Sequence, residues 1–167
     1  MKIVLMTKPA FFVEEDKILT ALFDEGLDNL HLYKPGAAPV YSERLLTLLP
    51  DGFRGKFSRT CASVDEIREA RRKAEYVFLK DTFSTTDDEK ANQLQNARLE
   101  RAADCGLIDR KVYAFGGVNI DNIRVAKELG FGGIVICNDL WDRFDIHHQL
   151  DYKELITHFE RIRKMAN

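Results

Sequence analysis

Six short apolar runs alternate with amphipathic stretches along the whole chain, and this alternation constrains the fold more than any other feature. The runs cover residues 2–7, 29–34, 55–60, 75–80, 111–117 and 132–139. Short apolar runs are typical of parallel strands buried on both faces, and the stretches between them place apolar residues at helical spacing. No linker rich in Pro, Gly or Ser interrupts the series. The pattern predicts an α/β fold with one continuous parallel sheet, in a single domain over residues 1–167.

Helices are expected between these runs, with the longest at about residues 14–25, 87–105 and 152–165. Ser63 and Glu66 have the spacing of a capping box for another helix. Thr85 or Thr86 is the expected cap of the helix that starts near residue 87. The acids there are better explained by the helix dipole than by a metal ion, and they are Asp81, Asp87, Asp88 and Glu89.

The length of the chain bears on how the sheet can close. A complete eight-stranded barrel usually needs at least about 200 residues, and this chain has 167. Six parallel strands must therefore either curl towards a barrel or stay open.

Composition excludes several classes of function. The net charge is −2, and lysines and arginines are mixed with acids, so there is no basic face for nucleic acid. No run of about 18 apolar residues is present, and the N-terminal apolar run is too short for a signal peptide. Three cysteines without close pairing favour a reducing cytoplasm over a disulfide framework. We expect a cytoplasmic protein with no membrane or nucleic-acid partner.

Residues 11–35, 61–79 and 106–144 resemble the thiamine phosphate synthase and thiazole tautomerase family of bacterial TIM barrels. The resemblance follows the family's order and covers most of the chain. It implies a barrel shortened to about six βα units, in which the third and fourth strands of the family are missing. In the family those strands carry the acids that bind Mg²⁺ on the pyrophosphate, so no metal ligands are expected here.

The resemblance also points to candidate site residues. Lys34 matches the family's lysine after the second strand, whereas Tyr33 replaces an arginine that is aimed at the pyrophosphate. Gly116 and Gly117 match the turn that holds the thiazole phosphate in the family. Lys80 lies at the analogous end of the fourth run and could add a positive charge, and Asn138 stands where the family usually has a glycine. The residues expected to line the pocket are His31, Tyr33 and Cys137.

The glycine pair also has a simpler interpretation. A glycine lets the backbone approach an oxyanion, and the next helix N-terminus offers free N–H groups. Glycine is equally the least strained residue for a left-handed turn between a strand and a helix, with Asn119 or Asp121 as the cap. In the same way, His147 and His148 are expected at the surface, and Cys61 and Cys137 as small buried residues without a catalytic partner.

Three functional interpretations stay open. In the family, pyrophosphate leaves a pyrimidine-methyl diphosphate and the resulting cation is captured by the nitrogen of a thiazole phosphate. The first interpretation is a family member with lost or impaired transferase activity that keeps a site for a small phosphorylated metabolite. The second is a non-catalytic scaffold or an engineered, trimmed barrel, and the third is an active enzyme with rearranged ligands. Because the missing strands leave an open edge, we also expect a homo-oligomer.

Overall fold

The computed structural model describes residues 1–49, 58–61, 63–145 and 152–167. Its six strands form one sheet in which every neighbouring pair is parallel, in the order β2-β1-β6-β5-β4-β3. The strands are β1 (Lys2–Met6), β2 (Asn29–His31), β3 (Ser58–Cys61), β4 (Tyr76–Leu79), β5 (Val112–Phe115) and β6 (Gly133–Ile136). This confirms the expected α/β fold, a parallel (βα) repeat shortened from a TIM barrel.

The sheet is curled but is not closed by strand pairing in the described residues, because β2 and β3 form its two edges. Side chains bridge part of this distance on the concave side. The amide of Asn29 in β2 donates a 2.6 Å hydrogen bond to the hydroxyl of Tyr76 in β4. His31 packs edge-on against Phe78, with 5.3 Å between the ring centroids. The curl therefore brings β2 opposite β4 across the interior.

Aromatic side chains fill this interior. Tyr76 and Tyr113 are stacked at 4.8 Å, and Phe78 lies 6.0 Å from Phe115. Together with Val4 and Val135 they form a buried cluster of their own on the concave face. Six strands enclose less space than eight, and large rings occupy it.

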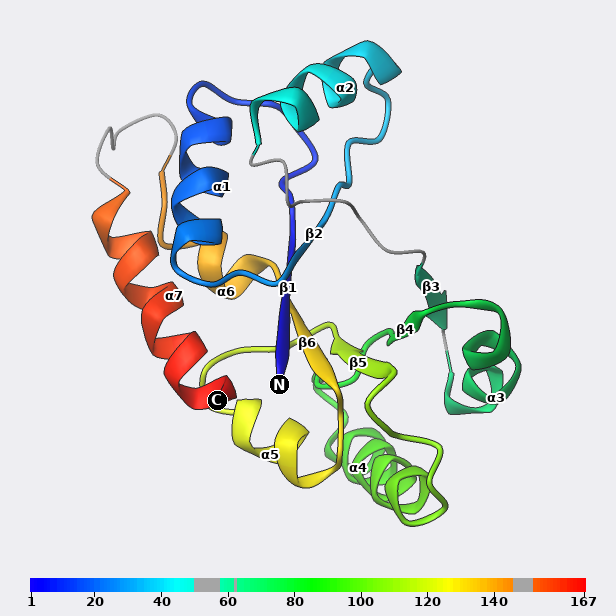
Figure 1. The fold of residues 1–167 in the computed structure, drawn as a ribbon. Coiled ribbons are helices and arrows are strands. Elements are labelled where there is room, and N and C mark those ends of the chain that lie inside the picture. The colour runs from blue at the N-terminus through cyan, green and yellow to red at the C-terminus, as the bar shows by residue number, and fades with distance from the viewer. Residues whose placement is uncertain (50–57, 62, 146–151) are drawn as a thin grey trace.

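Seven helices connect and flank the strands in the described residues, and Figure 1 shows most of them around the outside of the curled sheet. They are α1 (Glu15–Asp24), α2 (Pro39–Leu48), α3 (Val64–Lys73), α4 (Glu89–Asp104), α5 (Ile123–Glu128), α6 (Asn138–Trp141) and α7 (Lys153–Ala166). The main core lies between these helices and the convex face of the sheet. Its fully buried members include Ile3, Leu5, Ile18, Leu22, Ile134 and Phe159.

Several local predictions differ from the structure. The N-cap of α4 is Asp88 rather than Thr85 or Thr86, and its carboxylate accepts from the N–H groups of Lys90 and Ala91 at 3.0 and 3.3 Å. A carboxylate combines capping with the favourable charge at a helix N-terminus. Ser63 does occupy the N-cap of α3, but its side chain makes no capping hydrogen bond.

The helix α5 and the last strand also differ in detail. The N-cap of α5 is Asn122, whereas the side chain of Asn119 accepts from the N–H groups of Asp121 and Asn122 and shapes the preceding turn. The strand expected over 132–139 ends at Ile136, because α6 begins at Asn138. A helix of four residues is too short to show a periodicity in the sequence. Residues 55–57 of the expected third strand and His147 and His148 lie outside the described residues. Among the described residues, no helix is long and apolar enough to cross a membrane.

Candidate functional site

The carboxyl ends of the strands form the rim where parallel α/β folds place their ligands. The strand register puts Leu5 beside Ile136, and Phe115 beside Val135. The residues that follow β1, β5 and β6 therefore emerge at the same end of the sheet. They are Thr7, Lys8, Gly116, Gly117, Cys137 and Asn138.

Lys34 is held in a buried ion pair at this end of the molecule. Its ammonium lies 2.6 and 2.9 Å from the two carboxylate oxygens of Glu15, and the two side chains are 2% and 3% exposed. It also donates to the carbonyl of Ala10 at 2.9 Å and sits 4.5 Å from the centroid of the Phe11 ring. A lysine ammonium has three donors, and all three are used within the protein.

The alternation of β2 explains why Lys34 faces α1. Asn29 and His31 point into the interior, whereas Leu30 belongs to the core beneath the helices. Lys34 continues the row of Leu30, and the first turn of α1 supplies Glu15. Burial raises the pKa of Glu15 and lowers the pKa of Lys34, and in each case the contact between the two opposes the shift. The pair thus anchors the start of α1 to the end of β2.

Glycine is required at positions 116 and 117 for two reasons. Both residues have a left-handed backbone conformation, and the backbone of the 81–84 loop packs closely against them. Their φ angles are +91° and +68°. A Cβ on Gly116 would lie 2.8 Å from the amide nitrogen of Asp81, and one on Gly117 would collide with the carbonyl of Phe83. The loop that follows β4 is fastened there, since the N–H groups of Thr82 and Phe83 donate to the carbonyls of Phe115 and Gly116, both at 2.9 Å.

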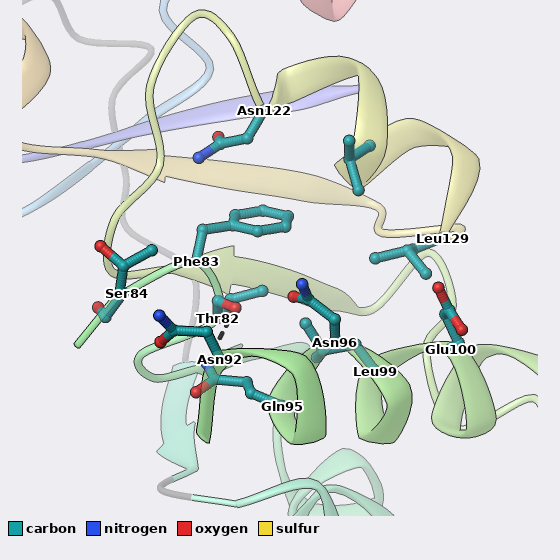
Figure 2. A pocket seen from close by; sticks show the side chains of 12 residues that line it. Thr82, Phe83, Ser84, Asn92, Gln95, Asn96, Leu99, Glu100, Asn122 and Leu129 are labelled. Carbon is teal, nitrogen blue, oxygen red and sulfur yellow. Dashed lines mark hydrogen bonds between the residues drawn. The ribbon is translucent and has the colours of Figure 1, made fainter. Parts of the chain in front are cut away.

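This loop is held from the other side by α4. The amide of Gln95 donates to the carbonyls of Asp81 and Thr82, and Thr82 Oγ1 donates to the Leu79 carbonyl at 2.6 Å. Asn122 Nδ2 donates to the Gly117 carbonyl at 2.7 Å. Figure 2 shows these side chains around a cavity of about 360 Å³ between α4 and α5, next to Phe83. The amides of Gln95 and Asn122 therefore fix the backbone on both sides of the glycine turn.

The other predicted site residues are spread around the rim. Lys80 is 54% exposed, 4.0 Å from the carboxylate of Asp81, and lines a groove of about 650 Å³ between α3 and α4. His31 is half-buried, and burial lowers its pKa. Tyr33 is exposed, although its N–H donates to Thr7 Oγ1 at 2.9 Å. The predictions that Lys80, His31 and Tyr33 contact a ligand stay predictions.

Cys137 and Asn138 stand at the end of β6. Burial is the main cause that raises the pKa of Cys137; the charge of Asp142 raises it further, and that of Lys8 opposes the rise. Asn138 is exposed at the first position of α6. The structure thus brings Lys8, Cys137 and the glycine turn to one end of the sheet, and sends Lys34 to α1 and Lys80 to the α3–α4 groove.

Lys8 and Glu15 were missed by sequence reasoning. Lys8 is half-buried directly beyond the end of β1, and no ion pair or hydrogen bond of its ammonium is found within the described part of the chain. Its place after an apolar run is a signal that could have marked it, because parallel α/β folds place their ligands at the carboxyl ends of the strands. Nothing in the sequence marks the pairing of Glu15 with Lys34.

Two carboxylates near the strand ends, those of Asp81 and Asp139, face basic side chains. Within residues 1–49, 58–61, 63–145 and 152–167, no group of three or more His, Cys, Asp or Glu could hold a metal. Asp139, near the end of β6, is instead paired with His158 at 2.8 Å. Asp81 faces Lys80 on the surface.

Comparison with solved structures places the chain in a family. Thiamine phosphate pyrophosphorylase from Bacteroides thetaiotaomicron is 37% identical, with a TM-score of 0.86, and the match covers 99% of this chain and 98% of that one. The pyrophosphorylase from Pyrococcus furiosus (16% identity, TM-score 0.50, 99% and 95% covered) and native KDPGal (14%, 0.59, 99% and 94%) share the fold. The sequence matches no protein-family model, and no curated protein is recognised as its relative.

The chain belongs to the thiamine phosphate pyrophosphorylase, or thiamine phosphate synthase-like, family. The match covers almost the full length of the Bacteroides protein. The shared fold therefore extends over nearly the whole of both chains.

Proposed function

We propose that this protein is a thiamine phosphate synthase-like protein of thiamine metabolism with lost or strongly impaired transferase activity. It keeps at most a site for a small phosphorylated metabolite, such as thiazole phosphate, at the carboxyl ends of β1, β5 and β6. The main support is the loss of free positive charge after β2, where Tyr33 replaces the arginine that the family aims at the pyrophosphate and the adjacent Lys34 is neutralised by Glu15 and 2% exposed.

The loss of this charge matters because of the chemistry. Departure of pyrophosphate builds up negative charge on the leaving group, and enzymes stabilise it with preorganised cations and metal ions. In this chain Tyr33 replaces the arginine, Glu15 pairs with the lysine, and the described residues hold no cluster of three or more metal-ligating side chains. Each lost charge of this kind typically costs two to three orders of magnitude in rate, so transfer should be very slow.

Retention of a phosphate site has separate support. Lys8 has no partner within the described part of the chain and stands at the same end of the sheet as the glycine turn. Backbone N–H groups of a glycine turn beside a free ammonium are a common arrangement for a phosphate. Lys8, rather than Lys34, would then supply the charge.

The test begins with both substrates. Incubation with the pyrimidine-methyl diphosphate, thiazole phosphate and Mg²⁺ should give no thiamine phosphate above the uncatalysed level, whereas calorimetry with thiazole phosphate alone should show binding. Product formation would overturn the loss of activity and would favour an enzyme with rearranged ligands. Absence of both product and binding would favour the interpretation as a non-catalytic scaffold. The packing of the 81–84 loop onto both glycines supports that interpretation.

Lys8→Ala sharpens the binding arm. Removal of one charge-assisted contact should weaken the binding of thiazole phosphate by roughly 10-fold. The matched control is Lys2→Ala, since Lys2 is an exposed lysine at the opposite end of β1 that pairs with Asp28. The Lys2→Ala variant should bind thiazole phosphate with the affinity of the wild type. Equal affinities for both variants would place the phosphate away from Lys8.

A further inference from the structure

Exposed apolar side chains concentrate on one helix of this protein. Nine large hydrophobic residues are exposed in the described part of the chain, and five of them fall between residues 33 and 48. The other four are scattered over separate elements. The five are Tyr33 (46% exposed), Val40 (53%), Tyr41 (55%), Leu46 (43%) and Leu48 (61%).

Helix α2 carries four of these residues and is apolar on more than one side. Leu45 is its only buried residue. Val40, Arg44 and Leu48 are four residues apart, so they lie above one another along the helix with Tyr41 beside them. We call this stripe the α2 face. Figure 1 shows α2 at the periphery, far from α3 and α4.

Strand pairing at the neighbouring sheet edge is a poor way to cover this region. β2 is three residues long, and the N–H of Leu30 already bonds to the side-chain oxygen of Asn29 at 2.9 Å. Short edge strands with satisfied groups resist pairing with another chain. The surface in this region that favours contact with a partner is therefore that of α2 and not the edge of β2.

We propose that the α2 face is a two-fold interface between two copies of this chain, with α2 packed antiparallel against α2 of the partner subunit. Val40, Tyr41 and Leu48 of the α2 face expose on the order of 300 Å² of apolar surface, since about half of each side chain of roughly 150–250 Å² is exposed. A stable interface buries about 800 Å² on each partner. The patch thus supplies the apolar centre, and the neighbouring polar residues of α2 supply the rim.

Charge complementarity favours a second copy over an unrelated partner. Glu43 and Arg44 are the two middle residues of α2, and neither has an ion-pair partner in the described part of the chain. Antiparallel packing about a two-fold axis brings Glu43 of one copy beside Arg44 of the other, and the symmetry makes this contact twice. The surface therefore complements itself in charge.

Sedimentation equilibrium over a range of concentrations tests this interface. We expect a dimer for the wild type. Leu48→Glu should weaken dimerisation by on the order of 100-fold, because two carboxylates would be buried in an apolar centre. Leu94→Glu is the matched control, since Leu94 is a leucine of α4 with a similar exposure of 54%, and it should dimerise like the wild type. Equal loss in both variants would overturn the proposed interface.

Charge reversal tests the two-fold geometry itself. Glu43→Arg places two arginines opposite two arginines and should weaken the dimer by about 10-fold. The double variant Glu43→Arg with Arg44→Glu restores opposite charges and should recover most of the affinity. No recovery would show that these residues do not meet across the interface. A wild type that stays monomeric at all concentrations would overturn the proposal and leave another macromolecule as the occupant of the α2 face.

Discussion

The rim at the carboxyl ends of the strands is packed in different ways beside β2 and beside β5 and β6. On the β2 side, a lysine and a glutamate are buried together and satisfy one another. On the side of β5 and β6, two glycines let the backbone of the 81–84 loop pack directly onto the turn. The ammonium of Lys34 is internal on the first side, whereas on the second the ammonium of Lys8 makes no ion pair or hydrogen bond within the described part of the chain. The proposed function predicts that transfer chemistry and phosphate binding can be separated in this fold.

Breaking the ion pair should have the largest effect. Lys34→Met leaves the carboxylate of Glu15 buried without a partner, and the free energy of unfolding should fall by about 3–5 kcal/mol, as measured by urea denaturation. The double variant Lys34→Met with Glu15→Leu should regain most of the stability, because an apolar pair can replace a buried ion pair.

The control for this experiment is the exposed pair of Arg124 and Glu128 on α5, where the side chains are 79% and 64% exposed. Arg124→Ala should barely change the urea midpoint, since exposed pairs contribute little. If Lys34→Met were as mild as Arg124→Ala, the β2 side of the rim would not depend on its buried charges.

The glycine side should respond to added volume. Gly117→Ala combines a left-handed conformation that alanine tolerates poorly, at about 1–2 kcal/mol, with a collision against the carbonyl of Phe83. Overpacking adds about 1–3 kcal/mol, so the free energy of unfolding should fall by about 2–5 kcal/mol in total. Thiazole phosphate binding should also be lost.

Gly36→Ala separates the two causes. Gly36 has a φ of +77°, but nothing lies within 4 Å of an added Cβ. The free energy of unfolding of Gly36→Ala should therefore fall only by the cost of the left-handed conformation, about 1–2 kcal/mol. Equal losses at Gly36 and Gly117 would mean that the loop does not press on the turn.

The sheet and the family could be predicted from the sequence, but the side-chain and loop contacts of the candidate site could not. Six apolar runs are enough to predict six parallel strands, since burial on both faces leaves a direct mark on composition. The partner of Lys34 depends on which side of β2 the lysine faces, and Glu15 is 19 residues away in the sequence. Likewise, the approach of Phe83 to Gly117 is a contact between two loops, and neither loop carries a periodic signal.

The interior beneath both sides of the rim provides the smallest and most selective test. Burial is the main cause that raises the pKa of Tyr113 to about 12 from 10.0. The unfolded state loses this proton first, so stability is intact below pH 10 and falls as the pH rises towards 12. A shift of two units corresponds to at most about 2–3 kcal/mol. Tyr113→Phe should lack this alkaline decline, and the difference in phenolate absorbance between the wild type and this variant isolates the titration of Tyr113 from that of the other four tyrosines. A Tyr113 that ionised near 10 would mean that water enters between β2 and β4, and that the side-chain bridge from Asn29 to Tyr76 does not seal the open side of the sheet.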